Sequence, residues 1–190
     1  MIIKNYKELA VSSIRKDALN ILIEGLNKVR PDILMRNTVR YNEDFNNLIV
    51  LNKHHDIISG RMFVIGAGKA AGMMAETLEK IMGPKHIKAG VVNTWSAKYK
   101  TKKIKIIKAG HPWPDKAGVK GVLAMLKLKE KYKINKKDLV ICLLSGGGSA
   151  MLPLPSDGVN LGEMKKTAQI LTAAGANISE INIVRKHVSK

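Results

Sequence analysis

Cysteine is almost absent from this 190-residue sequence, in which Cys142 is the single example. One thiol can build neither a disulfide framework nor a cysteine-rich metal site, so a reducing cytoplasm is the expected compartment. His54, His55 and His86 have no carboxylate or histidine at helix-ligand spacing, so no metal site is expected at these residues. No apolar run approaches the length of about eighteen residues that a membrane span needs, and charges are scattered through the N-terminus, which excludes a cleavable export signal.

Acidic and aromatic residues are also scarce. The chain has 15 Asp and Glu against 33 Lys and Arg, a formal net charge of +18, and only 4% aromatic residues. The lysine-dense stretches 98–108 and 127–137 alternate lysine with apolar residues, which is typical of a solvated strand or helix face. The excess of positive charge would suit a nucleic acid, an acidic membrane surface or a small anionic substrate. Base recognition favours arginine and aromatic side chains, so the composition favours a solvated lysine face over a nucleic-acid site.

Strand-like and helix-like patterns alternate along the chain. With 45% hydrophobic and 25% charged residues the sequence is that of a globular protein, and its length suits one domain. Asn160 followed by Glu163 predicts a capping box, and Gly175 a helix end. The pattern predicts an α/β fold, a parallel sheet with helices on both faces. The expected helices are 6–29, 70–82, 116–131 and 161–174, with a further one at the chain end, and the expected strands are 48–51, 62–65, 89–93, 104–110 and 138–144.

The first candidate site follows the strand 62–65, where Gly66 and Gly68 precede Lys69. Glycine at such a turn lets backbone N–H groups approach an anion, and the next helix adds its N-terminal partial charge. The spacing resembles a dinucleotide fingerprint, but the next strand ends in Asn93 rather than an acidic residue. The loop is not a Walker A motif, because its first glycine and its Ser or Thr are missing. Glycine here can also serve packing alone, and Lys69 shifts the interpretation toward function.

The second candidate is the segment AGHPWPD, residues 109–115, which follows the strand residues IKIIK, 104–108. Its two prolines stiffen the loop and present His111 and Asp115 at the carboxyl end of a strand. Both side chains could orient a substrate hydroxyl or accept its proton. The structural alternative is a rigid turn in which Asp115 caps the next helix.

The third candidate is a run of three glycines between two serines, directly after an apolar strand. Successive glycines can form a nest of backbone N–H groups that binds oxyanions, and the serines add hydroxyl donors. Neither serine lies in the G-x-S-x-G pattern of a hydrolase nucleophile. The alternative is a flexible surface turn. The residues concerned are Ser145, Gly146, Gly147, Gly148 and Ser149.

A basic segment closes the chain. Asn182, Arg185, Lys186 and His187 lie close together there, and Arg185 is one helical turn from Ser189, so these two could face one cleft. Read alone, the segment is an ordinary basic helix.

The elements GAGKAA, GHPWPD, LLSGGGSAMLPLP and INIVRKHVSK, in this order, strongly resemble the amino-terminal part of the class II glycerate 2-kinases, a family sometimes named hydroxypyruvate reductases. The resemblance spans nearly the whole chain. It implies that residues 1–190 form a Rossmann-like amino-terminal α/β domain, with the family's second domain absent from this chain. It also implies transfer of the γ-phosphoryl group of ATP, with Mg²⁺, to the 2-hydroxyl of D-glycerate.

The resemblance assigns roles by position. It makes Lys69 and Arg185 catalytic, and makes the loop 145–149 a cradle for phosphate or the glycerate carboxylate. The remaining binding positions it implies are Gly66, Gly68, His111, Asp115, Asn182, Lys186 and His187. Ile183 stands where the family has threonine, and Val188 where it has leucine.

Three functions remain open from the sequence. The first is the glycerate 2-kinase, completed by a second domain or subunit. The second is a non-catalytic domain that binds an anion or nucleotide within a split enzyme. The third is a hydroxypyruvate reductase, against which Asn93 argues.

Overall fold

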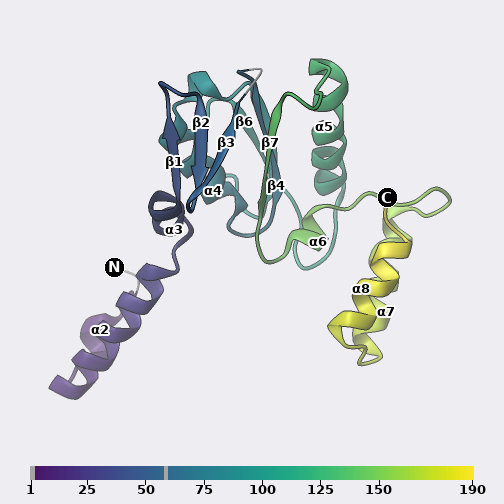
Figure 1. Cartoon of the computed structure of the whole chain (residues 1–190). Helices are drawn as coiled ribbons and strands as arrows, with labels where there is room; N and C mark the ends of the chain where they lie inside the picture. The colour runs from purple at the N-terminus through teal and green to yellow at the C-terminus, as the bar shows by residue number, and fades with distance from the viewer. Residues whose placement is uncertain (1–2, 58–59) are drawn as a thin grey trace.

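The computed structural model describes residues 3–57 and 60–190. Its centre is a four-stranded sheet in the order β6-β5-β4-β7, in which every neighbouring pair is parallel (Figure 1). The chain adds β5 and β6 on one side of β4 and then returns to add β7 on the other. Such a reversal is where open α/β sheets bind ligands. The strands are β4 (Met62–Ala67), β5 (Ala89–Thr94), β6 (Ile104–Lys108) and β7 (Leu139–Leu144).

Helices cover both faces of this sheet, as the sequence predicts. Val64 and Val92 are fully buried in the cluster that includes the apolar residues of α4 (Ala71–Met82). On the other face, the Phe63 ring lies 5.3 Å from the ring of Tyr132, the last residue of α5 (Lys116–Tyr132). Successive strand residues point to opposite faces, so the apolar run of β4 can serve both helices. The expected α/β fold is confirmed.

The contact between α5 and β5 is built on Asn93 and glycine. Asn93 is fully buried, and its Nδ2 donates to the carbonyls of Gly118 at 3.0 Å and Met151 at 2.6 Å. Gly121 packs against the amide of Asn93 so closely that a Cβ at position 121 would overlap Oδ1. A glycine at this position therefore sets how near α5 lies to the sheet.

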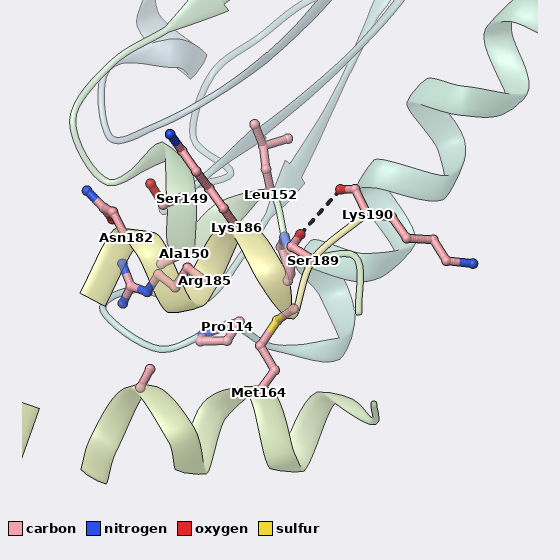
Figure 2. Close-up of a pocket in the computed structure, with 12 residues that line it drawn as sticks. Pro114, Ser149, Ala150, Leu152, Met164, Asn182, Arg185, Lys186, Ser189 and Lys190 are labelled. Atoms are coloured by element: carbon pink, nitrogen blue, oxygen red, sulfur yellow. Dashed lines mark hydrogen bonds between the residues drawn. The ribbon is translucent and has the colours of Figure 1, made fainter. Parts of the chain in front are cut away.

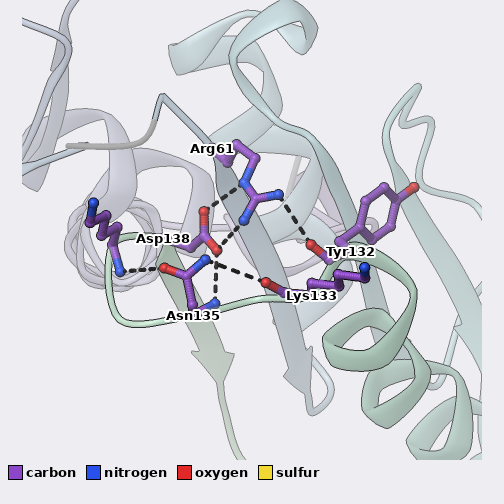
Figure 3. Close-up of polar contacts among 6 residues, drawn as sticks. Arg61, Tyr132, Lys133, Asn135 and Asp138 are labelled. Carbon is purple, nitrogen blue, oxygen red and sulfur yellow. Dashed lines mark hydrogen bonds and ion pairs between the residues drawn. The ribbon is translucent and has the colours of Figure 1, made fainter.

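Arg61 and Asp138 join the starting ends of β4 and β7 (Figure 3). Nε and Nη2 of Arg61 donate to the two carboxylate oxygens of Asp138 at 2.7 and 2.6 Å, and Nη1 donates to the Tyr132 carbonyl at 3.1 Å. The Asp138 side chain is fully buried. A bidentate pair of this kind is geometrically specific, so it fixes both strands and the end of α5 relative to one another.

A second, antiparallel sheet in the order β1-β2-β3 packs with α3 (Pro31–Thr38) near α4. The sequence predicts one strand here, residues 48–51, which corresponds to β2. It does not predict the other two. Pro31 is a first-turn residue of α3, where its missing N–H costs nothing. The strands are β1 (Val39–Asn42), β2 (Asn47–Val50) and β3 (Lys53–Asp56).

The expected helix 6–29 is wrong in one respect, because it is divided into α1 (Tyr6–Leu9) and α2 (Ser13–Lys28). The break is stabilised by Ser12, whose Oγ accepts a hydrogen bond from the Arg15 N–H at 3.3 Å. This N-cap is the reason that a new helix begins at residue 13. Figure 1 shows α2 extending away from the sheet at one end of the molecule.

Beyond β7 the chain forms α6 (Gly148–Met151), α7 (Leu161–Ala173) and α8 (Ile178–His187). The predicted capping box of Asn160 and Glu163 is present, and Gly175 has the positive φ of a helix end. Figure 1 shows α7 and α8 side by side at the end of the molecule away from α2. Within the described ranges, no helix is long and apolar enough to cross a membrane.

Gly121→Ala tests the close contact between α5 and β5. The added Cβ overlaps Asn93 Oδ1, and Asn93 cannot turn without losing two buried hydrogen bonds. Overpacking of this kind costs about 1–3 kcal/mol, which lowers Tm by at least about 2 °C in a chain of this size. Differential scanning calorimetry measures the change. The matched control is Gly25→Ala in α2, where no atom lies within 4 Å of the new Cβ and helix propensity raises stability. Equal changes in Tm for Gly121→Ala and Gly25→Ala would contradict the close contact between α5 and β5.

Candidate functional site

Two glycine-containing loops interlock at the carboxyl ends of β4 and β7. The Lys69 N–H donates to the Gly146 carbonyl at 3.0 Å, and the Ser145 N–H donates to the Ala67 carbonyl at 3.1 Å. The Ala70 N–H donates to Ser145 Oγ at 3.0 Å. The loops lie where the strand order reverses, so the first and third candidate sites are parts of one place.

The two glycines of the first loop are packing residues in this arrangement. A Cβ at Gly66 would overlap the Leu143 carbonyl oxygen, and a Cβ at Gly68 would overlap Ser145 Oγ. Gly68 also has a φ of 135°, which other residues rarely adopt. Both positions therefore require glycine so that β4 and its loop can approach β7.

The N–H groups of the first loop are already in use. Gly68 donates to the Asn93 carbonyl at 3.1 Å and Ala71 to the Gly68 carbonyl at 3.2 Å, while Lys69 and Ala70 donate to the second loop. The expectation that these amides receive an anion therefore does not hold. The polar group that this loop leaves exposed is the ammonium of Lys69.

The second loop keeps donors for a ligand. In the part of the chain that the structure describes, the N–H groups of Gly146 and Gly147 have no acceptor, whereas the Gly148 N–H donates to the Ser145 carbonyl at 3.2 Å. Gly147 has a φ of 87°, the left-handed conformation that turns successive amides toward one side. The predicted nest thus loses the Gly148 amide but keeps those of Gly146 and Gly147, with Ser145 holding the loop in place.

His111 and Lys69 lie at the same loop. A Cβ on Gly147 would lie 3.0 Å from His111 Nε2 and 3.5 Å from Lys69 Cγ. Burial, and then the charge of Lys69, lower the pKa of His111 below its ordinary value of 6.5. The imidazole is therefore neutral at pH 7, the state in which it can accept a proton.

Asp115 has a structural task that the sequence also allows. Its Oδ1 accepts a hydrogen bond from the Gly118 N–H at 2.8 Å, so it is the N-cap of α5. A Cβ at Gly110 would lie 3.1 Å from Asp115 Oδ2, which shows how closely this carboxylate is packed. The interpretation of Asp115 as a helix cap is confirmed, and this carboxylate is already engaged.

The basic segment lines a cavity of about 520 Å³ beside α6 (Figure 2). Figure 2 shows Asn182, Arg185 and Lys186 extending from α8 on the side where Ser149 lies. Among the described residues neither Arg185 nor Lys186 has an acidic partner, so both cations are open to an anionic ligand. Arg185 and Ser189 line the same cavity, as their spacing predicts. The other lining residues include Pro114, Leu152, Met164 and Ala168.

His187 is not part of this cavity. Its Nδ1 donates to the Ile183 carbonyl at 2.8 Å, one helical turn back, on an exposed face of α8. Met164 and Ala168 are lining residues that the sequence reasoning does not single out. Their spacing of four residues on the apolar face of α7 is the available signal, but it equally describes a residue pair of the core.

The described side chains provide no ready set of metal ligands. The described ranges contain no group of three or more His, Cys, Asp or Glu residues that could hold an ion. The nearby carboxylate of Asp115 caps α5. The residues of the site suit anionic oxygens, through the amides of Gly146 and Gly147, a lysine and two further cations.

Fold and site together define a class: an α/β protein whose loops carry donors suited to anionic oxygens at the reversal of its strand order. Residues 17–190 match the sequence profile of a family described as "Domain of unknown function (DUF4147)". The chain belongs to this family, and its resemblance to the class II glycerate 2-kinases is confirmed at that level.

The similar proteins are named either as glycerate kinases or as hydroxypyruvate reductases. A glycerate 2-kinase of Pyrococcus horikoshii is 38% identical over 93% of this chain and 39% of its own. The crystal structure of a glycerate kinase from Thermotoga maritima matches with a TM-score of 0.73 and 34% identity, over 93% of this chain and 39% of that one. A relative from Agrobacterium vitis, named as a hydroxypyruvate reductase, is 38% identical over 68% of this chain and 33% of its own. This chain thus spans less than half the length of these relatives.

The coupling between Lys69 and His111 can be tested by titration. Lys69→Met removes the positive charge that opposes protonation, so the pKa of His111 rises. It stays below 6.5, because burial is the larger cause of the shift. NMR of the imidazole resonances against pH measures this, with Lys129→Met on the exposed side of α5 as the control that leaves His111 unchanged. A His111 pKa that is the same in Lys69→Met and wild type would show that the two groups are not neighbours.

Proposed function

We propose that this chain is the amino-terminal part of a glycerate 2-kinase, which transfers the γ-phosphoryl group of ATP to the 2-hydroxyl of D-glycerate and gives 2-phosphoglycerate. The observation that supports this most directly is the convergence of Lys69, His111 and the free amides of Gly146 and Gly147 at one loop. Both substrates are anionic, and phosphoryl transfer depends mainly on positioning and on stabilising charge.

In this proposal each group has a distinct task. The amides of Gly146 and Gly147 donate to phosphate or carboxylate oxygens, and Lys69 neutralises charge on the transferring group. The neutral imidazole of His111 orients the substrate hydroxyl and accepts its proton. Arg185 and Lys186 hold a second anionic group in the neighbouring cavity.

The residues of the site suit the phosphate groups of ATP better than they suit Mg²⁺. The free amides, the lysine and the cations of α8 are all donors to phosphate oxygens. The described carboxylates offer no cluster for a metal, so Mg²⁺ is expected to bind with the nucleotide, and no step above passes through it.

The alternatives differ in what they require of the chain. A non-catalytic binding domain uses the same donors, and differs only in needing a second polypeptide for turnover. A reductase needs a nicotinamide nucleotide, whose ribose is typically held by an acidic residue at the end of the second strand. Asn93 takes that place here, and its amide is committed to Gly118 and Met151 in the core. This geometry favours the kinase.

Lys69→Met tests the kinase directly. Isothermal titration of the chain with ATP should show affinity at least about tenfold lower in the variant, because a charge-assisted contact is worth about 1.5–3 kcal/mol. In an ADP-release assay with D-glycerate, the chain is co-expressed with the part of the Pyrococcus relative that it does not span. There the variant should lose about 100-fold in rate.

Lys129→Met, an exposed lysine of α5, is the matched control and should behave as wild type. Equal activity of Lys69→Met and wild type would remove Lys69 from the mechanism. Oxidation of NADH or NADPH with hydroxypyruvate, in the absence of any ADP release, would replace the kinase by the reductase.

A further inference from the structure

The two edge strands of the parallel sheet are built differently. β6 has the sequence IKIIK and exposes Lys105 and Lys108. Charged side chains on an edge strand are a common protection against pairing with another chain. β7 has the sequence LVICLL, with no charge in six residues. Such a continuous apolar run is typical of an interior strand that is covered on both faces.

β7 is nevertheless uncovered on one face. Val140 is 42% exposed and Leu144 is 58% exposed, and Cys142 between them is exposed as well. These residues alternate with Leu139, Ile141 and Leu143, which pack toward α4. The helix on their own side, α5, packs mainly against β5 and β6, so β7 lies beyond its cover.

The backbone of β7 is also half unpaired. The Leu139 N–H donates to the Arg61 carbonyl at 3.1 Å and the Ser145 N–H to the Ala67 carbonyl at 3.1 Å, so the odd-numbered residues bond to β4. In a parallel ladder the intervening residues point the opposite way. The N–H groups of Val140, Cys142 and Leu144 therefore face the open edge.

We propose that β7 is an interior strand in the assembled protein, and that its open edge pairs with a strand from polypeptide equivalent to the part of the relatives that this chain does not span. The length of that missing part supports this occupant, since the Pyrococcus relative is matched over only 39% of its length. A second copy of this chain is disfavoured, because each copy has a net charge of +18.

The test co-expresses the chain with the unmatched part of the Pyrococcus glycerate 2-kinase. The purified sample is compared with the chain alone. Sedimentation velocity should show a one-to-one complex. Hydrogen exchange at single amides should slow at least tenfold at Val140, Cys142 and Leu144, because those N–H groups gain acceptors. Val140→Lys copies the edge protection of β6 and should weaken the complex at least tenfold, and Val140→Lys with Leu144→Lys should weaken it further. Circular dichroism verifies that both variants remain folded.

Ile21→Lys is the matched control, because Ile21 is 74% exposed on α2 at a distant end of the molecule. It should leave the complex intact. The proposal is overturned if no complex forms, if Ile21→Lys rather than Val140→Lys disrupts it, or if exchange at β7 is unchanged on binding. It is also overturned if β7 is protected in the chain alone as its concentration rises, which would identify a second copy as the occupant. The readout is structural, so loss of kinase activity alone leaves it unaffected.

Discussion

The hydrogen bond from the Ala70 N–H to Ser145 Oγ joins two loops that are far apart in the sequence. Together with the bond from Lys69 to Gly146, it decides which donors remain for a ligand. The first loop uses its amides to hold the second, whose own amides at Gly146 and Gly147 have no acceptor among the described residues. The ammonium of Lys69 is carried to the same place because its own backbone is part of the junction. Ser145 thus shapes the site from within, because its hydroxyl oxygen accepts a hydrogen bond from the Ala70 N–H.

Glycine has two different physical roles within this one site. Gly66 and Gly68 are required because neighbouring backbone occupies the space of a Cβ, and their amides are bonded inside the protein. Gly147 is required because its φ of 87° turns its amide outward, beside His111. A glycine-rich loop is therefore not by itself evidence of binding. The distinction depends on which N–H groups have acceptors, and that depends on contacts between distant segments.

The sequence predicts the parallel sheet, its covering helices and the helix caps, because these follow from local periodicity and from pairs such as Asn160 and Glu163. It fails at β3, whose residues Lys53–Asp56 are all exposed and carry no apolar pattern. It also fails at the break before α2, where Ser12 acts against an otherwise continuous helical period. Within the site, the residue types are predictable, but the occupancy of each amide is not, since it is set by long-range packing. Asp115 shows both sides, because the sequence allows it as a cap or as a proton acceptor, and the cap is what the structure contains.

The loop that carries the free amides is the direct continuation of the strand with the open edge. Leu144, whose N–H faces that edge, is followed at once by Ser145, which holds the two loops together. A strand that is paired on both sides has less backbone freedom than one paired on one side. The pairing that we propose at β7 would therefore restrict the residues that place Gly146 and Gly147 beside Lys69 and His111. Completion of the sheet would then also order the proposed anion site, and this gives a structural reason for a site divided between this chain and further polypeptide.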